Sequence, residues 1–317
     1  MRDTTTQWFT SAAVTFAAAP LVRKAMLAAG TMDVPNHRSS HTTPIPRGGG
    51  LAALVGMGAA VLVGGRRGLD ARIVAPVLAL ATTGYSDDRA SANGGLPAMA
   101  RLGIQVGAGL CIGDSTALGR LTAVLTVPGV VNVVNFMDGI NAITALTCIT
   151  WGLHAAAGAR PDVRLLGAVT AGSAAGFLPW NAPEAQMFLG DVGSYLYGGV
   201  MATGIILSFQ GKHRFLEATK VGAALLPYAA DAAQAIYRRR TAGASLTEAH
   251  REHTYQQLVD LGALNHSATA VLHAAVATIC AQAWRRTPPP AAAAISVGAV
   301  GAYLAAPRLA RRLRSKR

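Results

Sequence analysis

The chain has 317 residues, of which 51% are hydrophobic and only 14% are charged, well below the roughly 25% of a soluble domain. Its formal net charge is +13, which can indicate nucleic-acid binding, yet no basic stripe interleaved with aromatic side chains is visible. The composition therefore excludes an ordinary soluble protein, argues against a nucleic-acid partner, and predicts an integral membrane protein with many spans in a lipid bilayer.

Apolar stretches follow one another along nearly the whole chain. The predicted spans are 8–27, 48–64, 71–85, 102–113, 118–135, 138–157, 163–180, 189–208, 216–237, 266–284 and 290–306. Several are shorter than the roughly 20 residues of a straight membrane helix, but abundant Ala and Gly suit close helix packing in lipid. The stretch 102–113 is short and interrupted by glycine, so the count is ten or eleven. We expect an all-α, polytopic membrane protein with a single domain over residues 1–317.

The first stretch has two interpretations. Arg2 precedes an apolar run with small residues at 17–19, as in a signal peptide. The run continues past Pro20 to the basic pair Arg23 and Lys24, which favours a retained span.

Eleven spans would place the long polar segments on one side of the membrane. These segments are the loops near 28–47, 86–101, 181–188 and 238–265, the short connection 136–137 and the basic tail 307–317. They contain the densest clusters of Lys and Arg, so the positive-inside rule makes this side cytoplasmic, with the tail on anionic lipid. Four aspartates reach the same face, namely Asp87, Asp88, Asp138 and Asp191. Ionisable groups at span ends are usually functional, so we expect an active site on the cytoplasmic face.

The first polar loop contains several cations beside a glycine triplet. No strand precedes the triplet 48–50, so it is not a dinucleotide-binding fingerprint. Arg38, His41 and Arg47 are candidates for binding a phosphate. The alternative is an interfacial loop whose cations reach toward water.

Adjacent carboxylates, Asp87 and Asp88, follow the third span. Their mutual repulsion is relieved by a cation, and Mg²⁺ prefers a few carboxylates together with substrate phosphate oxygens. The pair therefore predicts a metal site, with a solvated helix cap as the alternative.

Polar residues recur at a spacing of three between the fifth and sixth spans. Asn132, Asn135, Asp138 and Asn141 would lie along one face of a helix. Four polar groups in ten positions favour a ligand site over simple hydrogen bonding between helices.

The eighth span opens with a glycine-rich acidic segment, 188–194. Gly190 and Gly193 would let a substrate approach the backbone, and first-turn N–H groups can receive phosphate oxygens. Asp191 would bind the metal and Phe188 would stack on a base. The alternative is an Asp that caps its own helix.

The longest polar loop carries His250, Arg251 and His253. Two histidines three residues apart can bind zinc, but no nearby third ligand completes such a site. The three side chains also suit a diphosphate. A solvated helical face is the alternative.

Taken in order, these segments resemble the polyprenyl-phosphate N-acetylhexosamine-1-phosphate transferase family, glycosyltransferase family 4. The resemblance runs from about residue 30 to 260 and is carried by the segments 33–41, 46–52, 87–89, 132–141, 188–194 and 250–256. The forms Arg-Ser-Ser-His at 38–41 and Pro-Arg-Gly-Gly-Gly at 46–50 are similar to the branch that serves O-antigen-type surface polysaccharides. The peptidoglycan branch typically has three successive histidines in its last loop, which this chain lacks.

The resemblance implies an enzyme of the bacterial inner membrane, with a homodimer as a further expectation. Members transfer a sugar 1-phosphate from a UDP-N-acetylhexosamine to undecaprenyl phosphate, release UMP and require Mg²⁺, with Mn²⁺ as a substitute. By motif, Asp191 is the foremost Mg²⁺ ligand, and Asp87 and Asp88 orient the metal and the lipid phosphate, so these three are the implied catalytic and metal residues. The implied substrate-binding residues are Asn132, Asn135, Asp138, Asn141, Phe188, Arg38, His41, Arg47, His250, Arg251 and His253.

Three other classes remain as alternatives. One is the phospho-N-acetylmuramoyl-pentapeptide-type transferase of peptidoglycan synthesis. An intramembrane prenyltransferase would usually have paired Asp-x-x-x-Asp motifs, and the chain has one adjacent Asp pair instead. A non-enzymatic transporter of lipid-linked sugar would place its polar groups at the bilayer midplane, whereas here they collect at one face.

Overall fold

The computed structural model describes residues 2–35, 41–64, 70–90, 94–211, 213–244 and 251–315, and these are mainly helical. The helices are α1 (Arg2–Ala28), α2 (Gly50–Val63), α3 (Ala71–Ala90), α4 (Ala98–Ile112), α5 (Ala117–Met137), α6 (Ile143–Ala156), α7 (Pro161–Asn181), α8 (Gly190–Ser208), α9 (Arg214–Gly222), α10 (Leu226–Thr241), α11 (Thr254–Asp260), α12 (His266–Arg286) and α13 (Pro289–Arg314), with a 3-10 turn η3 (Ala223–Leu225) before α10. Two short strands, β1 (Met32–Asp33) and β2 (Ile45–Pro46), pair antiparallel within the first polar loop.

The predicted helical membrane class is confirmed. Among the described residues, four helices are long and apolar enough to cross a membrane, and these are α1 from Thr4 on, α5, α12 and α13. The shorter apolar helices α2, α4 and α6 stand beside them. The chain is therefore a multi-pass membrane protein. Its number of crossings remains a prediction, although the uncertain stretch 102–113 does form a helix, α4.

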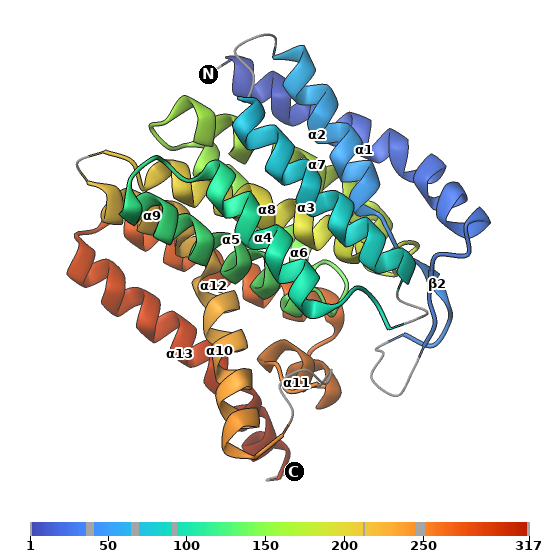
Figure 1. Ribbon diagram of the computed structural model, residues 1–317. Coiled ribbons are helices and arrows are strands. Elements are labelled where there is room, and N and C mark those ends of the chain that lie inside the picture. Colours follow the sequence, from blue (N-terminus) through green and yellow to red (C-terminus); the bar gives the residue numbers. More distant parts are fainter. Residues whose placement is uncertain are drawn as a thin grey trace.

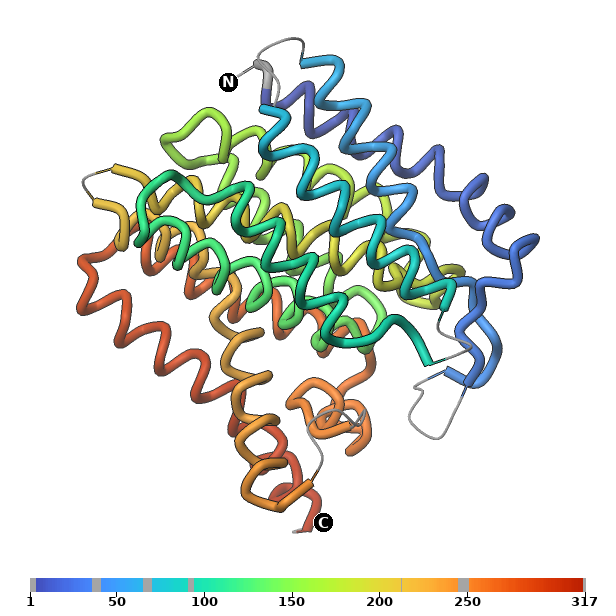
Figure 2. Tube along the Cα trace, in the orientation of Figure 1, coloured from blue at the N-terminus to red at the C-terminus, as the bar shows by residue number. Residues whose placement is uncertain are grey.

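Two predicted spans are wrong in their boundaries. The span 138–157 begins only at Ile143, because Asp138 leaves the helical conformation and Ala142 has a left-handed φ of 70°. The span 216–237 is divided into α9, η3 and α10. Pro227 lies in the first turn of α10, and a proline has no N–H to continue the preceding helix and clashes with the turn before it. In Figures 1 and 2, α10 leaves the main bundle and points toward the C-terminus.

Helix α8 forms the centre of the bundle. All of its residues are buried except Asp191 and Ile205, and it packs against helices that include α2, α3, α5 and α7. Small residues make this packing close: a Cβ on Gly50 of α2 would lie 2.2 Å from the Cα of Gly193. Such close approach of backbones is the usual source of helix association in lipid, and here it brings α2 onto the start of α8.

Loops far apart in sequence meet at one end of the bundle. The N–H of Phe188 donates to the carbonyl of Pro46 at 2.9 Å, and the hydroxyl of Tyr255 donates to the carbonyl of Phe136 at 3.3 Å. The β1–β2 hairpin, the end of α3 and the starts of α8 and α11 all lie toward this end, at the lower right and bottom of Figure 1. The expected gathering of the motif loops is present in the structure.

The contact between α2 and α8 predicts a position-specific cost in α2. Gly50→Ala should lower the free energy of unfolding by about 1–3 kcal/mol, the usual effect of overpacking a tight contact. Gly58→Ala is the matched control, because a Cβ there meets no atom within 4 Å. Thermal unfolding in detergent measures both. Equal stability of the two variants would contradict the close packing of α2 on α8.

Candidate active site

A buried carboxylate, Asp88, joins α3 to the start of α8. Its side chain accepts the backbone N–H of Asp191 on Oδ1 at 2.9 Å and that of Val192 on Oδ2 at 3.0 Å. The first N–H groups of a helix have no partner within it, and negative charge near them is stabilised. Asp88 therefore caps a neighbouring helix from a buried position, which differs from the solvated helix cap given as the alternative for this pair.

The glycines around this contact lie so close to other parts of the protein that a side chain would not fit. Gly190 has a left-handed φ of 75°, and a Cβ there would lie 2.6 Å from Oδ2 of Asp88. A Cβ on Gly84 would lie 2.2 Å from the carbonyl oxygen of Asp191. The expectation that Gly190 and Gly193 leave room for a substrate is wrong, because Asp88 and α2 take that room. The N–H groups of Asp191 and Val192, at the start of α8, donate to Asp88, so a phosphate would have to displace that carboxylate to bind them.

Arg47 connects the cap to the second carboxylate. Its Nε lies 3.0 Å from Oδ1 of Asp88, and its Nη2 lies 3.6 Å from Oδ1 of Asp191. Burial acts to lower the pKa of the Arg47 guanidinium, but the charges of Asp88 and Asp191 oppose this, and the pKa is raised from its ordinary value. Arg47 therefore stays cationic and balances the buried charge of the pair.

Asp191 is the more accessible member of the pair. Its side chain is 23% exposed, whereas that of Asp88 is 0% exposed. Asn135 of α5 donates to Oδ1 of Asp191 at 2.9 Å and to Oγ of Ser194 at 3.0 Å. Within the described ranges no hydrogen bond reaches Oδ2, so this oxygen is the one that Asp191 can offer to a ligand.

Asp87 is turned toward a different set of partners. Its Oδ2 pairs with Arg101 of α4 at 2.5 Å, and its Oδ1 accepts the N–H of Leu96 at 2.6 Å. A Cβ on Gly95 would lie 2.7 Å from Oδ1, so the glycine makes room for this contact. Asp87 thus fixes the connection between α3 and α4, and the start of α4, next to Asp88.

The expected shared helix face of the four polar residues 132, 135, 138 and 141 is wrong. Helix α5 ends at Met137 and Asp138 is its C-cap. Asn132 donates to Oε1 of Gln105 on α4 at 2.8 Å, while Asn141 donates to the carbonyl of Pro183 at 2.9 Å. Of the three asparagines, Asn135 is the one that binds Asp191. Asn132 and Asn141 form hydrogen bonds to other parts of the protein, as in the alternative interpretation, and do not share a ligand-binding face with Asn135.

The first-loop candidates lie close to the start of α8. His41 packs the edge of its ring on Phe188, with centroids 4.9 Å apart, and its Nε2 lies 3.9 Å from Asp33. Arg47 and Phe188 form an isolated parallel bridge. Arg38 lies outside the described residues.

The last polar loop is anchored to its surroundings. Arg251 pairs with Asp260 of α11. His253 is buried, with Nδ1 at 3.5 Å from Oδ1 of Asp231, and its ring stacks on Tyr255. His250 lies outside the described residues.

The donor set fits a cation held by one protein carboxylate. In the part of the chain that is described, no group of three or more His, Cys, Asp or Glu side chains forms a metal cage. Mg²⁺ is commonly bound through one or two carboxylates together with substrate phosphates and water. Asp191 can serve as such a carboxylate ligand, because Asn135 binds its Oδ1 and its Oδ2 accepts no hydrogen bond within the described ranges. Asp87 and Asp88 are bound by other partners.

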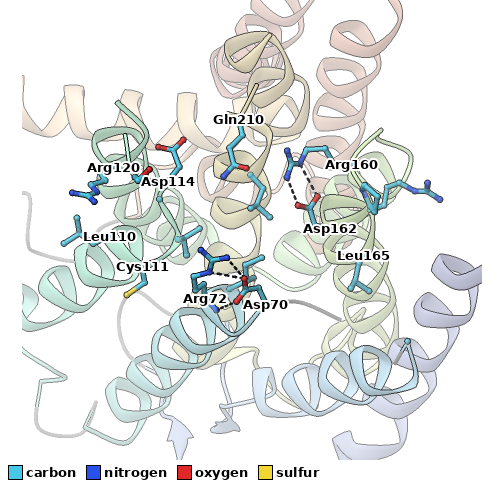
Figure 3. A pocket seen from close by; sticks show the side chains of 18 of the residues that line it. Asp70, Arg72, Leu110, Cys111, Asp114, Arg120, Arg160, Asp162, Leu165 and Gln210 are labelled. Atoms are coloured by element: carbon cyan, nitrogen blue, oxygen red, sulfur yellow. Dashed lines mark hydrogen bonds and ion pairs between the residues drawn. The ribbon is translucent and has the colours of Figure 1, made fainter. Parts of the chain in front are cut away.

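A polar cavity of about 1130 Å³ lies at the opposite end of the bundle. It is lined by the ends of α2, α4 and α8 and by the starts of α1, α3, α5 and α7. Figure 3 shows the ion pairs Arg72–Asp70 and Arg160–Asp162 in its wall. The predicted site residues are absent from this lining. The cavity is therefore separate from the carboxylate cluster.

Comparison with known proteins identifies the class. Residues 71–209 match the sequence model of glycosyl transferase family 4. The chain is 28% identical over 328 residues to decaprenyl-phosphate N-acetylglucosaminephosphotransferase of Mycolicibacterium smegmatis, across 86% of this chain and 79% of that protein. The matched residues, less than half of the chain, fall in the family that the motifs resemble, and together with this relative they indicate a sugar-phosphate transferase.

Two other relatives match over short segments. The undecaprenyl-phosphate alpha-N-acetylglucosaminyl 1-phosphate transferase of Thermotoga maritima is 50% identical over 36 residues, which is 11% of this chain and 12% of that protein. The phospho-N-acetylmuramoyl-pentapeptide-transferase of Mycobacterium bovis is 54% identical over 41 residues, 13% of this chain and 11% of that protein.

Several residues of the site were not predicted from the sequence. Arg101 pairs with Asp87, Ser194 accepts a hydrogen bond from Asn135, and Asp231 contacts His253. Asp231 lies inside the predicted span 216–237, where an ionisable residue is a functional candidate by default. That signal was available in the sequence. The partner of Arg101 could not be known before α3 and α4 were placed.

The geometry predicts different effects for two similar substitutions. Asp88→Asn should lower the free energy of unfolding by about 1–3 kcal/mol, because its amide group faces a buried N–H that then lacks an acceptor. Asp191→Asn, at the partly exposed position, should cost less than about 1 kcal/mol. Thermal unfolding of both variants in the same detergent tests this order, and a larger loss for Asp191→Asn would refute the capping role of Asp88.

Proposed function

We propose that this protein transfers an N-acetylhexosamine 1-phosphate from a UDP-sugar to undecaprenyl phosphate, releases UMP, and so initiates a lipid-linked surface polysaccharide. The reaction would occur on the cytoplasmic face of a bacterial inner membrane. The observation that carries the proposal is a carboxylate cluster at one end of the helical bundle, in which Asp88 and Asp191 pair with Arg47 and the adjacent Asp87 pairs with Arg101. An amphiphilic acceptor and a soluble donor can meet only at such a membrane surface.

The named relatives support the donor and acceptor classes. The M. smegmatis protein, matched over most of both chains, is named for a decaprenyl phosphate and N-acetylglucosamine phosphate. The T. maritima protein is named for undecaprenyl phosphate and N-acetylglucosamine 1-phosphate. The surface-polysaccharide branch rests on the motifs at 38–41 and 46–50.

Phosphoryl transfer depends on positioning and charge neutralisation more than on covalent catalysis. Arg47 and Asn135 hold Asp191 so that its Oδ2 can bind a cation. A bound Mg²⁺ would supply neutralisation of the diphosphate charge there. Arg47 and Arg101, at the two edges of the cluster, would add positive charge for the lipid phosphate.

Direct attack by the lipid phosphate agrees best with the contacts of Asp87. A phosphate monoester is largely dianionic at neutral pH, so one of its oxygens can attack the sugar-linked phosphorus without a strong base. That bond forms as the bond from phosphorus to the bridging oxygen breaks, and UMP leaves with the bridging oxygen. A carboxylate nucleophile would need an oxygen free to reach phosphorus, whereas both oxygens of Asp87 are engaged by Leu96 and Arg101.

One alternative activity has specific support. The match to the pentapeptide transferase covers 41 residues at 54% identity. A transferase of that type would accept UDP-N-acetylmuramoyl-pentapeptide as the donor. Presenting both donors with one lipid phosphate to the purified protein separates these two functions.

Asp191→Asn should reduce turnover on the order of 10³-fold, because removing one charge beside a phosphate-bridging cation costs several kcal/mol of transition-state stabilisation. The assay is UMP release from UDP-N-acetylglucosamine and undecaprenyl phosphate by purified protein, with Mg²⁺ or with a chelator. Asp162→Asn removes a carboxylate ion pair at the opposite end and should stay within about twofold of wild type.

Near-wild-type turnover of Asp191→Asn at saturating Mg²⁺ would remove Asp191 from this role. The same assay without lipid tests the mechanism. Direct attack predicts no UMP release, whereas a burst equal to the enzyme concentration would establish a covalent aspartyl-phosphate step.

A further inference from the structure

A second buried carboxylate, Asp231, lies on α10 away from the cluster around Arg47. It is 1% exposed. Both of its oxygens accept the backbone N–H of Thr254, at 2.9 and 3.0 Å, and the hydroxyl of Tyr303 donates to Oδ2 at 3.2 Å. Its Oδ1 also lies 3.5 Å from Nδ1 of His253. A buried charge is tolerated only when such donors compensate for lost water.

Helix α10 holds the last polar loop at more than this one point. The guanidinium of Arg238 donates to the carbonyl of Glu252 at 3.3 Å, and that of Arg239 pairs with the Glu252 carboxylate at 3.0 Å. Asp231 then receives the N–H of Thr254 at the first residue of α11. The segment 252–254 is thereby fixed along one side of α10.

The next residue carries this attachment to the site. Tyr255 is fully buried, its ring stacks on that of His253, and its hydroxyl donates to the carbonyl of Phe136 at the end of α5. A Cβ on Gly139 would lie 2.2 Å from the Tyr255 hydroxyl oxygen. Tyr255 therefore lies directly against the turn that connects α5 to α6 and carries Asp138.

We propose that Asp231 is a positioning residue that fixes the segment 253–255 against the turn 136–139, and through this turn sets the nucleotide-binding side of the site. The role of the turn in binding the UDP-sugar rests on the proposed function. The partners of Asp231 lie on two other parts of the chain, namely Tyr303 on α13 and the consecutive residues His253 and Thr254 at the start of α11. A carboxylate that served only α10 would have its partners on α10.

The arrangement explains why a charge is buried here. An apolar residue at 231 would fill the same space without a desolvation cost, but it would leave the N–H of Thr254 and the Tyr303 hydroxyl without an acceptor. Buried polar groups of this kind specify one arrangement of their neighbours. A single carboxylate thus makes the position of 253–255 depend on α10 and α13 together.

Asp231→Asn tests the proposal in the purified full-length protein. Asparagine keeps the shape but replaces one acceptor oxygen with a donor facing the Thr254 N–H. We expect kcat/KM for UDP-N-acetylglucosamine to fall on the order of 10- to 100-fold, the usual range for a residue that orients a ligand-contacting group. Most of the change should be in KM for the UDP-sugar, with KM for undecaprenyl phosphate changed by less than about threefold.

A double-mutant cycle separates positioning from general loss of structure. Tyr255→Phe removes the hydroxyl contact with Phe136, so Asp231→Asn should add less than about twofold in that background, because the two act in one chain of contacts. Tyr303→Phe, which removes one donor to Asp231, provides a milder variant that keeps the test open should Asp231→Asn fail to fold. Asp114→Asn is the matched control, since Asp114 accepts the N–H of Thr116 at the opposite end and should leave both KM values unchanged.

Amide hydrogen exchange provides a readout that does not depend on the proposed function. In Asp231→Asn, amides of 138–142 should exchange at least about tenfold faster, while those of α8 stay unchanged. Unchanged exchange in this turn, or multiplicative losses in the double mutant, would overturn the positioning role. If exchange changes as expected but wild-type protein releases no UMP from any UDP-sugar, the proposed function fails and the positioning role stands.

Discussion

The buried carboxylate of Asp88 is the constraint on which the rest of this end of the molecule depends. A charge with no exposed surface needs strong compensation, and it obtains this from the first N–H groups of α8 and from Arg47. These contacts bring together α3, α8 and the loop before α2, three parts of the chain that are distant in sequence. Removing any one partner leaves an uncompensated group in a buried setting.

The same constraint explains the glycines that surround the site. Gly84 and Gly190 are needed because Asp88 must reach the α8 backbone directly, and Gly50 and Gly193 let α2 follow. Asp191 is consequently held at the edge of the cluster by Asn135 and Arg47. A site organised before its substrates arrive loses little on reorganisation during the reaction. The rigid core around α8 therefore serves the phosphoryl transfer that we propose.

Much of this arrangement follows from the sequence. Each predicted span contains at least one helix in the structure. The alternation of spans across the membrane correctly predicted that the motif loops lie at one end of the bundle. Two features were not accessible. The polar spacing of three at 132–141 indicates a helix face, but Ala142 with its left-handed backbone and the C-cap at Asp138 end the helix before the pattern does. Local periodicity cannot show where a tertiary contact, here Tyr255 against Gly139, favours a turn.

Charge pairing was the other feature that sequence patterns could not provide. The pair Asp87–Asp88 suggested one shared metal site, yet the two side chains are directed to different partners, Arg101 and the start of α8. Adjacent residues on a helix point about 100° apart, so they readily serve different neighbours. Which neighbours these are depends on how α4 and α8 pack against α3, information that is spread over more than 100 residues of sequence.

A structure of the protein determined with UDP-N-acetylglucosamine and Mg²⁺ would test the central claim most directly. The account predicts the diphosphate and a cation beside Oδ2 of Asp191, with Asp88 still accepting the backbone N–H groups of Asp191 and Val192. It would be contradicted by a nucleotide bound in the polar cavity at the opposite end. A cation coordinated by Asp88 after that carboxylate had left the α8 backbone would contradict it equally.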